Sequence, residues 1–509
     1  MKKILYAIRH TPFGTAAAAV CFSFFILLSS ESFAAAPAGT TDTEAQHEIE
    51  LHQYIQLLGS VFEFAQRNYV DEIDPAELYK GAMNGLMNAF GDPYTSYLDT
   101  SMMRDLSATT SGSFGGVGLT ISKAFESTPE DPAYVLVASP IEDGPGYKAG
   151  IQAGDLIVEI DGQNTADISM DDVLSLLRGK ENTTVDLLIR RGKTMEFAVT
   201  LTRAIIEVPT VKYGMIDSTG YLRIIEFTPQ TASRVQEALD SFEKEGYTSL
   251  IIDLRNNPGG LIASVADVAD KFIDSGTIVS TKSRLTYENS VYTASPKSTT
   301  VPKGLPIAVL INRGSASASE ILAGALKDHH IAYLVGERTF GKGSVQQPIP
   351  LPNQDGIKIT IARYYTPSDV NIDKIGIPPD KEVLFPEFSE EEETAYVELI
   401  ESGVIAAYVE EHPDLNEQEI AAYAQTLSQD YALDLRTLRR LIRMETERTG
   451  PASLYDLDFD IQLCAALDVV AADNFSALVH NAKTLKELQE EAAAQEELAK
   501  SETEPAPAM

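Results

Sequence analysis

The sequence predicts an α/β protein: a parallel-sheet core with a small inserted β-module and helical regions at both ends. Three observations lead to this prediction. Residues 44–98 show amphipathic helical periodicity, residues 111–203 hold short β-type runs between glycine-rich turns, and residues 210–384 alternate strands with helices. A chain of 509 residues with 44% hydrophobic residues has enough material for about three domains.

The charge balance and the cysteine count exclude several classes of protein. The chain has 40 Lys and Arg against 75 Asp and Glu, a formal net charge of −35. Since phosphate neutralisation needs a basic surface, a general nucleic-acid binder is excluded. Two cysteines, Cys21 and Cys464, cannot form a disulfide framework or a cysteine-rich metal site. No H-E-x-x-H helix or other metal-ligand cluster is present in the sequence, so no metal is expected.

The N-terminus is typical of an exported protein. Lys2, Lys3 and Arg9 precede an apolar run over residues 16–28, and small residues follow at 32–36 with an Ala-x-Ala-like end. A basic start, a short apolar centre and a small-residue end predict a secretory signal peptide. We therefore expect residues 1–36 to be a signal peptide or, if uncleaved, a membrane anchor, and we expect a periplasmic or other extracytoplasmic location.

Residues 43–100 are expected to form an N-terminal helical region. Its apolar stripe has the i, i+3, i+4 spacing of one buried helix face and consists of Leu51, Tyr54, Ile55, Leu58, Val61, Phe62 and Ala65. The stripe is expected to pack either on its own domain or on a second copy of the chain, and the second alternative predicts a homo-oligomer. The region closes at the turn sequence Gly-Asp-Pro-Tyr, residues 91–94.

Two further regions follow, a β-module over residues 101–205 and a core over residues 206–385. In the module we expect strands at 117–121, 134–138, 156–160 and 185–189, with a helix at 170–177. In the core we expect strands at 248–254, 305–312 and 332–335 and helices at 261–273 and 319–327. Strands joined by crossover helices form a parallel sheet, whose active sites lie at the carboxyl ends of its strands.

The C-terminal part is predicted to be helical over residues 386–489, opening with a capping box at Ser389 and Glu392. Residues 490–509, an Ala/Glu stretch followed by Pro-Ala-Pro-Ala, are expected to be disordered.

Three loops at predicted strand ends carry the candidate chemistry. The first is RGSASASE, residues 313–320, between a strand and a helix. Its small residues allow a sharp turn that presents a hydroxyl, and the N–H groups of the following helix favour negative charge there. The alternative use of these serines is helix capping, which we expect of Ser319.

The second loop is GERTFGKGS, residues 336–344, one residue away from a nucleotide-binding P-loop. Gly343 stands where the magnesium-binding hydroxyl belongs, and Pro348 stops the long helix that a P-loop requires. We therefore reject nucleotide binding.

The third loop is DLRNNPGG, residues 253–260, whose two glycines allow N–H groups to turn into a cleft as in an oxyanion hole. An ordinary strand–helix loop is the alternative for this motif.

Taken together, the loops suggest a serine nucleophile with a base and an oxyanion site. His329 and His330 lie at the far end of the helix that follows the serine turn, where neither imidazole is expected to return to the hydroxyl. Lys342, on a separate glycine-flanked loop, is able to serve as the base if desolvation lowers its pKa enough to leave a neutral amine.

Four segments, residues 91–98, 253–260, 315–327 and 336–347, resemble those of the carboxyl-terminal processing, or tail-specific, proteases. The resemblance implies an α/β protease core with a crotonase/Clp-like β-α-β sheet and no cofactor. It implies that Ser317 is the nucleophile, Lys342 the general base and Gln346 the residue that orients the lysine. It also implies an oxyanion hole from the N–H of Ala318 and one N–H from Gly259 or Gly260, and a supporting role for Asp328.

The β-module resembles a PDZ domain, in which GGVGL, residues 115–119, matches the carboxylate-binding loop. Backbone N–H groups of Gly116, Val117, Gly118 and Leu119 would then bind a peptide's terminal carboxylate while the peptide adds as a strand. The resemblance implies that Arg178 links PDZ occupancy to the active site; the alternative is a surface arginine at a helix end. One departure is Asp369, which stands where the family usually has glycine.

The predicted function is that of a serine endopeptidase that recognises protein C-termini through its PDZ domain and cleaves the chain upstream with a Ser/Lys dyad. Its partners would be protein or peptide substrates with a free C-terminus. A catalytically silent PDZ adaptor of the same fold is the main alternative, and a crotonase-like acyl-CoA enzyme is the other.

Overall fold

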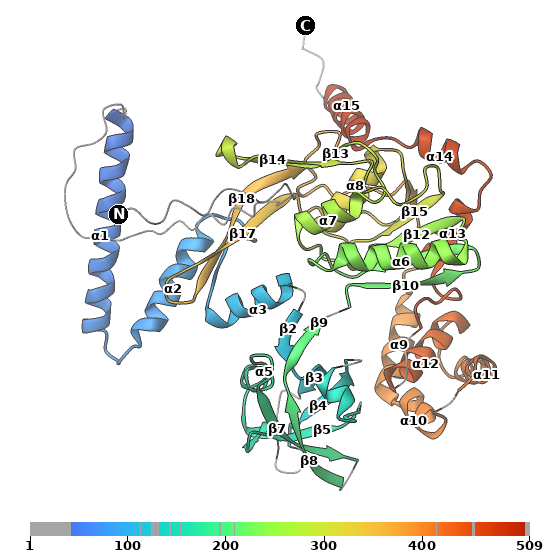
Figure 1. Cartoon of the computed structure of the whole chain (residues 1–509), viewed down its shortest axis with the longest axis horizontal. Coiled ribbons are helices and arrows are strands. Elements are labelled where there is room, and N and C mark those ends of the chain that lie inside the picture. The colour runs from blue at the N-terminus through green and yellow to red at the C-terminus, as the bar shows by residue number, and fades with distance from the viewer. Residues whose placement is uncertain are drawn as a thin grey trace, which may run out of the picture. The chain divides into compact units, whose positions relative to one another are not determined.

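The computed structural model describes residues 42–503, except residues 112, 124–127, 129–131, 142–143, 153, 193–194, 208, 414 and 450–452 (Figure 1). The expected signal segment, residues 1–36, and the end of the expected disordered tail, residues 504–509, lie outside the described residues. The chain divides into two units, Met1–Tyr79 and Lys80–Met509, and each is described by itself.

The first unit contains helix α1 (Asp42–Asn68). The predicted helical periodicity is confirmed there, yet its apolar stripe does not form a core. Leu51, Tyr54 and Leu58 are 58%, 67% and 59% exposed. Packing of the stripe on its own domain is therefore not found within the described part of this unit. A second copy of the chain as the partner stays a prediction.

The second unit opens with the remainder of helix α2 (Pro75–Asn88), followed by strand β1 (Ser96–Leu98) and helix α3 (Thr100–Ser111). The expected helical character up to residue 98 is wrong for β1, which pairs with strand β18 (Gly356–Tyr365). The reason is tertiary: a three-residue segment takes its conformation from the sheet edge that it joins.

The main sheet of the core has the strand order β10-β11-β12-β15-β16-β19. Its strands are β10 (Val211–Ile216), β11 (Thr219–Ile224), β12 (Ser249–Asp253), β15 (Ile307–Ile311), β16 (Tyr333–Gly336) and β19 (Lys381–Glu382). From β11 to β19 every pairing is parallel, as predicted, and β10 joins as an antiparallel edge. All residues of β12 and β15 are buried, which explains their continuous apolar runs.

Helices cover both faces of this sheet (Figure 1). On one face lie α6 (Thr231–Glu245), α7 (Ile262–Ala269) and α8 (Ala318–Asp328). On the other face lie α13 (Ile461–Val470) and α14 (Phe475–Asn481), which come from the predicted C-terminal helical region. That region therefore contributes directly to the core, a role that its sequence alone did not indicate.

No single helix in the described chain has the length and apolar content needed to cross a membrane. Helices α13 and α14 together are long and apolar enough, but the chain bends sharply between them. Residues of both helices pack in the core against the main sheet.

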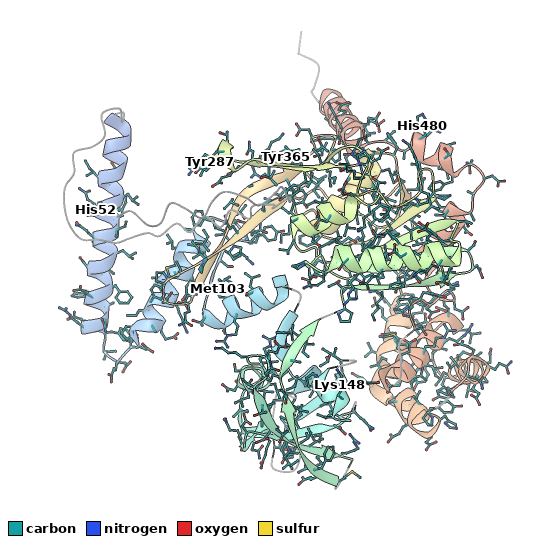
Figure 2. All side chains as sticks on the ribbon, in the orientation of Figure 1. His52, Met103, Lys148, Tyr287, Tyr365 and His480 are labelled. Carbon is teal, nitrogen blue, oxygen red and sulfur yellow. The ribbon has the colours of Figure 1, made fainter. Side chains whose placement is uncertain are left out.

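A second, antiparallel sheet has the order β1-β18-β13-β14, with β17 also paired to β18. It contains β13 (Gly276–Ser283), β14 (Ser290–Ala294) and β17 (Ser344–Pro350). Between β13 and β14 lies the short helix η2 (Thr286–Glu288), where Tyr287 is 82% exposed (Figure 2). Since β17 directly follows the near-P-loop sequence, a strand stands where nucleotide binding would need a helix.

The module before the core has the strand order β3-β4-β5-β7-β8, with β6 paired to β5. These strands are β3 (Leu119–Lys123), β4 (Val135–Pro140), β5 (Leu156–Ile160), β6 (Gln163–Asn164), β7 (Thr184–Arg191) and β8 (Met195–Thr202). Around them lie α4 (Pro145–Lys148), η1 (Thr165–Asp167) and α5 (Met170–Leu177). A separate ribbon pairs β2 (Ser113–Gly116) with β9 (Ala204–Glu207). The four predicted strands and the predicted helix are present, whereas β8 and the ribbon were not predicted.

The helices α9 (Glu390–Ser402), α10 (Val404–Glu411), α11 (Glu417–Leu427) and α12 (Leu435–Thr449) share a core of their own. The capping box of Ser389 and Glu392 is confirmed at the start of α9. Helix α15 (Leu485–Thr503) corrects the expected disorder of residues 490–503. Its Ala and Glu residues are strong helix formers, and Leu485 anchors its first turn in the core of the main sheet.

Candidate active site

Ser317 lies in the sharp turn between β15 and α8. Its backbone has φ 54° and ψ −114°, a conformation that is strained for a residue with a side chain and typical of functional turns. The two flanking serines donate to the neighbouring loop: Ser315 Oγ to Leu254 O at 2.8 Å and Ser319 Oγ to Asn257 O at 2.9 Å. Ser319 is therefore not the helix cap that we expected. Ser317 and Glu320 occupy the two positions of a capping box at the start of α8, and Ser317 Oγ makes no capping hydrogen bond there.

Gly259 and Gly260 lie next to this turn at φ 109° and 137°. A Cβ on Gly259 would be 2.8 Å from Ser317 Cβ and 2.9 Å from Ala318 N, and a Cβ on Gly260 would be 2.1 Å from Phe227 O. Both positions therefore exclude a side chain. The Gly259 N–H donates to Asn257 Oδ1 at 2.8 Å, whereas the N–H groups of Gly260 and Ala318 have no partner within the described chain. Of the two predicted glycines, Gly260 is thus the one with a free donor.

Lys342 lies on the loop after β16, between Gly341 and Gly343. Its side chain is half-buried, with Nζ 5.0 Å from the centre of the Tyr94 ring. Burial lowers the pKa of this amine and the positive charge of Lys358 lowers it further, while Glu320 acts in the opposite direction. The net pKa lies below the ordinary value, which is the direction that a general base requires.

Glu320 joins the serine turn to the lysine loop. Its carboxylate is fully buried and accepts from the N–H groups of Ser317 at 2.9 Å, Lys342 at 2.9 Å and Gly341 at 2.7 Å, and from Thr339 Oγ1 at 2.5 Å. Burial raises the pKa of this carboxyl, although the four hydrogen bonds act against the shift. Sequence reasoning missed Glu320 and Thr339 as site residues. The signal was present in the Ser-x-x-Glu spacing from Ser317 to Glu320.

Tyr364 on β18 provides a second link between the same two loops. Its hydroxyl lies 3.2 Å from the carbonyl oxygen of Ser317 and also hydrogen-bonds the carbonyl oxygen of Lys342. The side chain is buried, and burial raises its pKa well above the ordinary value, so the phenol stays protonated and able to donate. The second sheet therefore fixes both candidate catalytic residues from one side.

Gln346 on β17 is held by other residues than the lysine. Its Nε2 donates to Ser344 Oγ at 2.9 Å and to Thr360 Oγ1 at 3.1 Å, and Thr360 in turn donates to Asp92. Across the described residues no hydrogen bond joins Ser317 Oγ to Lys342 Nζ, or Lys342 to Gln346. The structure thus brings the three loops together without the direct proton-transfer contact.

The remaining predicted residues near the core have structural partners. His329 Nε2 contacts Thr277 O at 2.7 Å and His330 Nδ1 contacts Val479 O at 3.1 Å, both at the opposite end of α8 from the serine. Asp328 accepts from the N–H and Oγ of Ser368 and from the N–H of Leu485. Its supporting role stays a prediction. The described residues contain no group of three side chains able to hold a metal.

The backbone conformation of Asp369 bears on its departure from the family pattern. It has φ 63°, a left-handed conformation that glycine adopts without steric cost. Asp tolerates this region better than most residues, and its Oδ1 accepts from Lys282 at 2.5 Å. Asp369 therefore adopts a backbone conformation that glycine would also adopt at this position.

The candidate peptide site lies at strand β3, which forms an edge of its sheet. The preceding Gly118 has φ 68°, and Val117 packs in one core with Leu177 of α5. Arg178 follows α5 directly, and its guanidinium carbon lies 5.3 Å from the centre of the Phe114 ring on β2. The glycine loop, the edge strand and α5 are thus brought together, and Arg178 contacts the ribbon that precedes the loop.

Comparisons with known proteins place these features in a family. Residues 218–383 match the model of Peptidase family S41, residues 136–191 match a PDZ domain, and residues 15–102 match the Activating protease CtpB N-terminal domain. The core that carries Ser317 and Lys342 is therefore that of a serine-type peptidase.

Individual relatives belong to the same family. The carboxy-terminal-processing protease of Bartonella bacilliformis is 38% identical over 70% of this chain and 80% of its own length. CtpA of Bacillus subtilis is 31% identical over 74% and 76%. A solved structure, the photosystem II D1 C-terminal processing protease, is 31% identical over 64% of this chain and 92% of that chain, with a TM-score of 0.38. The chain belongs to the S41 carboxyl-terminal processing proteases, which sets aside both the adaptor and the acyl-CoA alternatives.

Proposed function

We propose that the peptidase works through a Ser317/Lys342 dyad. Neutral Lys342 takes the proton from Ser317 Oγ as the oxygen attacks the scissile carbonyl carbon. The N–H groups of Gly260 and Ala318 donate to the resulting oxyanion. Collapse of the tetrahedral intermediate breaks the C–N bond, and the leaving amine takes the proton from Lys342. A water activated by Lys342 then hydrolyses the acyl-enzyme.

The observation that supports this proposal most is the buried carboxylate of Glu320, which accepts from the N–H groups of both Ser317 and Lys342. Such a bridge fixes the distance between the backbones of nucleophile and base. The lowered pKa of Lys342 supports the same assignment. Gln346 completes the proposed dyad by accepting from the lysine through Oε1, since its Nε2 already donates to Ser344 and Thr360.

We also propose that the PDZ domain captures the free C-terminus of the substrate. An edge strand beside α5 offers unpaired backbone groups to an added peptide strand. The loop of residues 116–119 turns at positive φ, which allows successive N–H groups to face a carboxylate. Arg178, in contact with Phe114, is proposed as the link from an occupied PDZ domain to the core.

The basic and apolar N-terminus supports export, and we propose that the enzyme acts outside the cytoplasm.

The test is cleavage of an unfolded protein with an apolar C-terminal tail. We expect the natural chain to cleave it and both Ser317→Ala and Lys342→Ala to lose cleavage while still binding the tail. Ser315→Ala is the matched control, because Ser315 lies in the same run and its Oγ hydrogen-bonds Leu254 and Asn312, not the lysine loop. Full cleavage by either dyad variant would refute the mechanism. An amidated tail tests the PDZ proposal separately, since it lacks the carboxylate and should raise KM.

A further inference from the structure

The first turn of α13 contacts the catalytic loops from the opposite face of the main sheet. It lies outside residues 218–383, which match the S41 family, and beyond the two other matched segments. The contact is made to Arg255, which belongs to the loop of residues 253–260 that carries Gly259 and Gly260.

Arg255 is held by two carboxylates. Within its own loop it donates to Asp253, a buried residue at the end of β12 that also accepts from Tyr221 Oη at 2.7 Å. It also donates to Asp460, at the start of α13, through two hydrogen bonds: Nη1 to Oδ1 at 2.7 Å and Nη2 to Oδ2 at 2.6 Å. A paired contact of this kind fixes the plane of the guanidinium as well as its distance.

Gln462 extends the contact to the lysine loop. Its Oε1 accepts from Arg255 Nη1 at 3.2 Å, and its Nε2 donates to Glu337 Oε1 at 3.3 Å and to Val383 O at 2.8 Å. Glu337 directly follows β16, at the beginning of the loop that carries Lys342. The side chain of Gln462 is buried, and a buried polar atom that loses its partner costs stability.

The space behind the oxyanion loop is hollow. A cavity of about 420 Å³ is lined by Arg255, Asn256, Asn312, Asp460 and, from α12, Arg440 and Arg443. Asn256 has φ 58°, and Gly259 and Gly260 are also at positive φ, so this loop holds three residues in left-handed conformations. On the side of the cavity, the loop is held by the ion pair of Arg255 with Asp460 and by the hydrogen bond from the Asn256 N–H to Asn312.

We infer that Asp460 and Gln462 are positioning residues for catalysis: through Arg255 and Glu337 they hold the oxyanion loop and the lysine loop in register across the sheet. The inference rests on the proposed function, because the proposed oxyanion hole includes an N–H group of the loop that contains Arg255. It gives the C-terminal helical region a role in the chemistry of the core.

The test uses Asp460→Asn and Asp460→Ser in the full chain. Asp460 also caps α13 by accepting from the Leu463 N–H at 2.9 Å, and both Asn and Ser are good capping residues, so the helix start is retained. The Asn side chain keeps one oxygen toward Arg255 but has no negative charge. The Ser side chain is too short to contact Arg255. Asp458→Asn is the matched control, because Asp458 pairs with Arg439 and Arg443 and not with Arg255.

Two measured constants, kcat and the inhibition constant of a peptide boronate, distinguish a loss of positioning from a loss of stability. Loss of one oxyanion donor costs about 100-fold to 1000-fold in kcat, so displacement of the loop should cost less, about 10-fold in Asp460→Asn and more in Asp460→Ser. The inhibition constant of a peptide boronate, whose tetrahedral adduct on Ser317 uses the oxyanion hole, should weaken by a similar factor. KM should stay within about twofold, because the PDZ domain supplies tail binding. A variant that only unfolds in part lowers the active fraction and leaves the boronate constant unchanged.

Unchanged kcat and boronate affinity in Asp460→Ser would overturn the inference, and so would equal losses in Asp458→Asn. Failure of the proposed function has a different signature: Ser317→Ala would then still cleave, and the boronate would not compete for Ser317. The two failures are therefore distinguishable in one set of variants.

Discussion

Glu320→Gln tests the link between nucleophile and base with a change of one charge and almost no volume. Oε1 accepts from Thr339 Oγ1 and Gly341 N–H, and Oε2 accepts from Ser317 N–H and Lys342 N–H. An amide has one acceptor oxygen, so one of these pairs must face an NH₂ group. Thr339 is able to rotate its hydroxyl and accept, and the amide should therefore turn its nitrogen toward Thr339 and Gly341.

In that orientation one buried donor, the Gly341 N–H, loses its acceptor, and the remaining bonds lose their charge. One orphaned buried donor costs about 1–3 kcal/mol, so we expect Glu320→Gln to lower the free energy of unfolding by about 2 kcal/mol. The change also removes a negative charge that raises the pKa of Lys342. The alkaline-rising limb of the pH–rate profile should therefore move to lower pH, because the lysine becomes neutral earlier.

The assay combines urea unfolding in the Ser317→Ala background, which prevents self-cleavage, with kcat/KM measured across pH. We expect lower stability, at least a tenfold lower kcat at its optimum, and a limb displaced toward acid. A variant of unchanged stability and unchanged pH profile would refute the bridging role of Glu320. Ser317→Ala alone is the stability reference.

Three further predictions concern other contacts of the site. Lys358→Met should move the pH–rate limb to higher pH, because Lys358 lowers the pKa of Lys342; an unchanged limb would contradict that coupling. Gly260→Ala should abolish cleavage and reduce soluble folded protein, since its Cβ would lie 2.1 Å from Phe227 O; circular dichroism and turnover check this, and an active folded variant would contradict it. Asp369→Gly should raise the free energy of unfolding by about 0.5–1 kcal/mol by relieving its φ of 63°, because the exposed pair with Lys282 contributes little; destabilisation in urea would contradict it.

Most of the core was predictable because its signals are local. β12 and β15 read as continuous apolar runs, and both are buried on every residue. Glycine and serine patterns at their carboxyl ends indicated the active-site loops, since crossover topology brings those ends together.

The parts that were missed depend on partners distant in the sequence. β1 is three residues long and is a strand because β18 lies beside it. The expected contact of Gln346 with Lys342 stays a prediction, but the bond from its Nε2 to Thr360 was not predicted, because it is set by the register of β17 against β18. The contact between Asp460 and Arg255 spans 205 residues, and no local pattern reports it. The helical periodicity of α13 predicted a helix but did not indicate which residues it would contact.

The most direct test of the central claim is the pH dependence of Ser317 reactivity toward a fluorophosphonate, read by mass spectrometry at that serine. If Lys342 is the base, labelling should rise with pH through one ionisation below the ordinary lysine value of 10.5. The limb should move upward in Lys358→Met and labelling should be lost in Lys342→Ala. A Lys342→Ala enzyme that keeps the rate and pH profile of the natural chain would contradict the dyad.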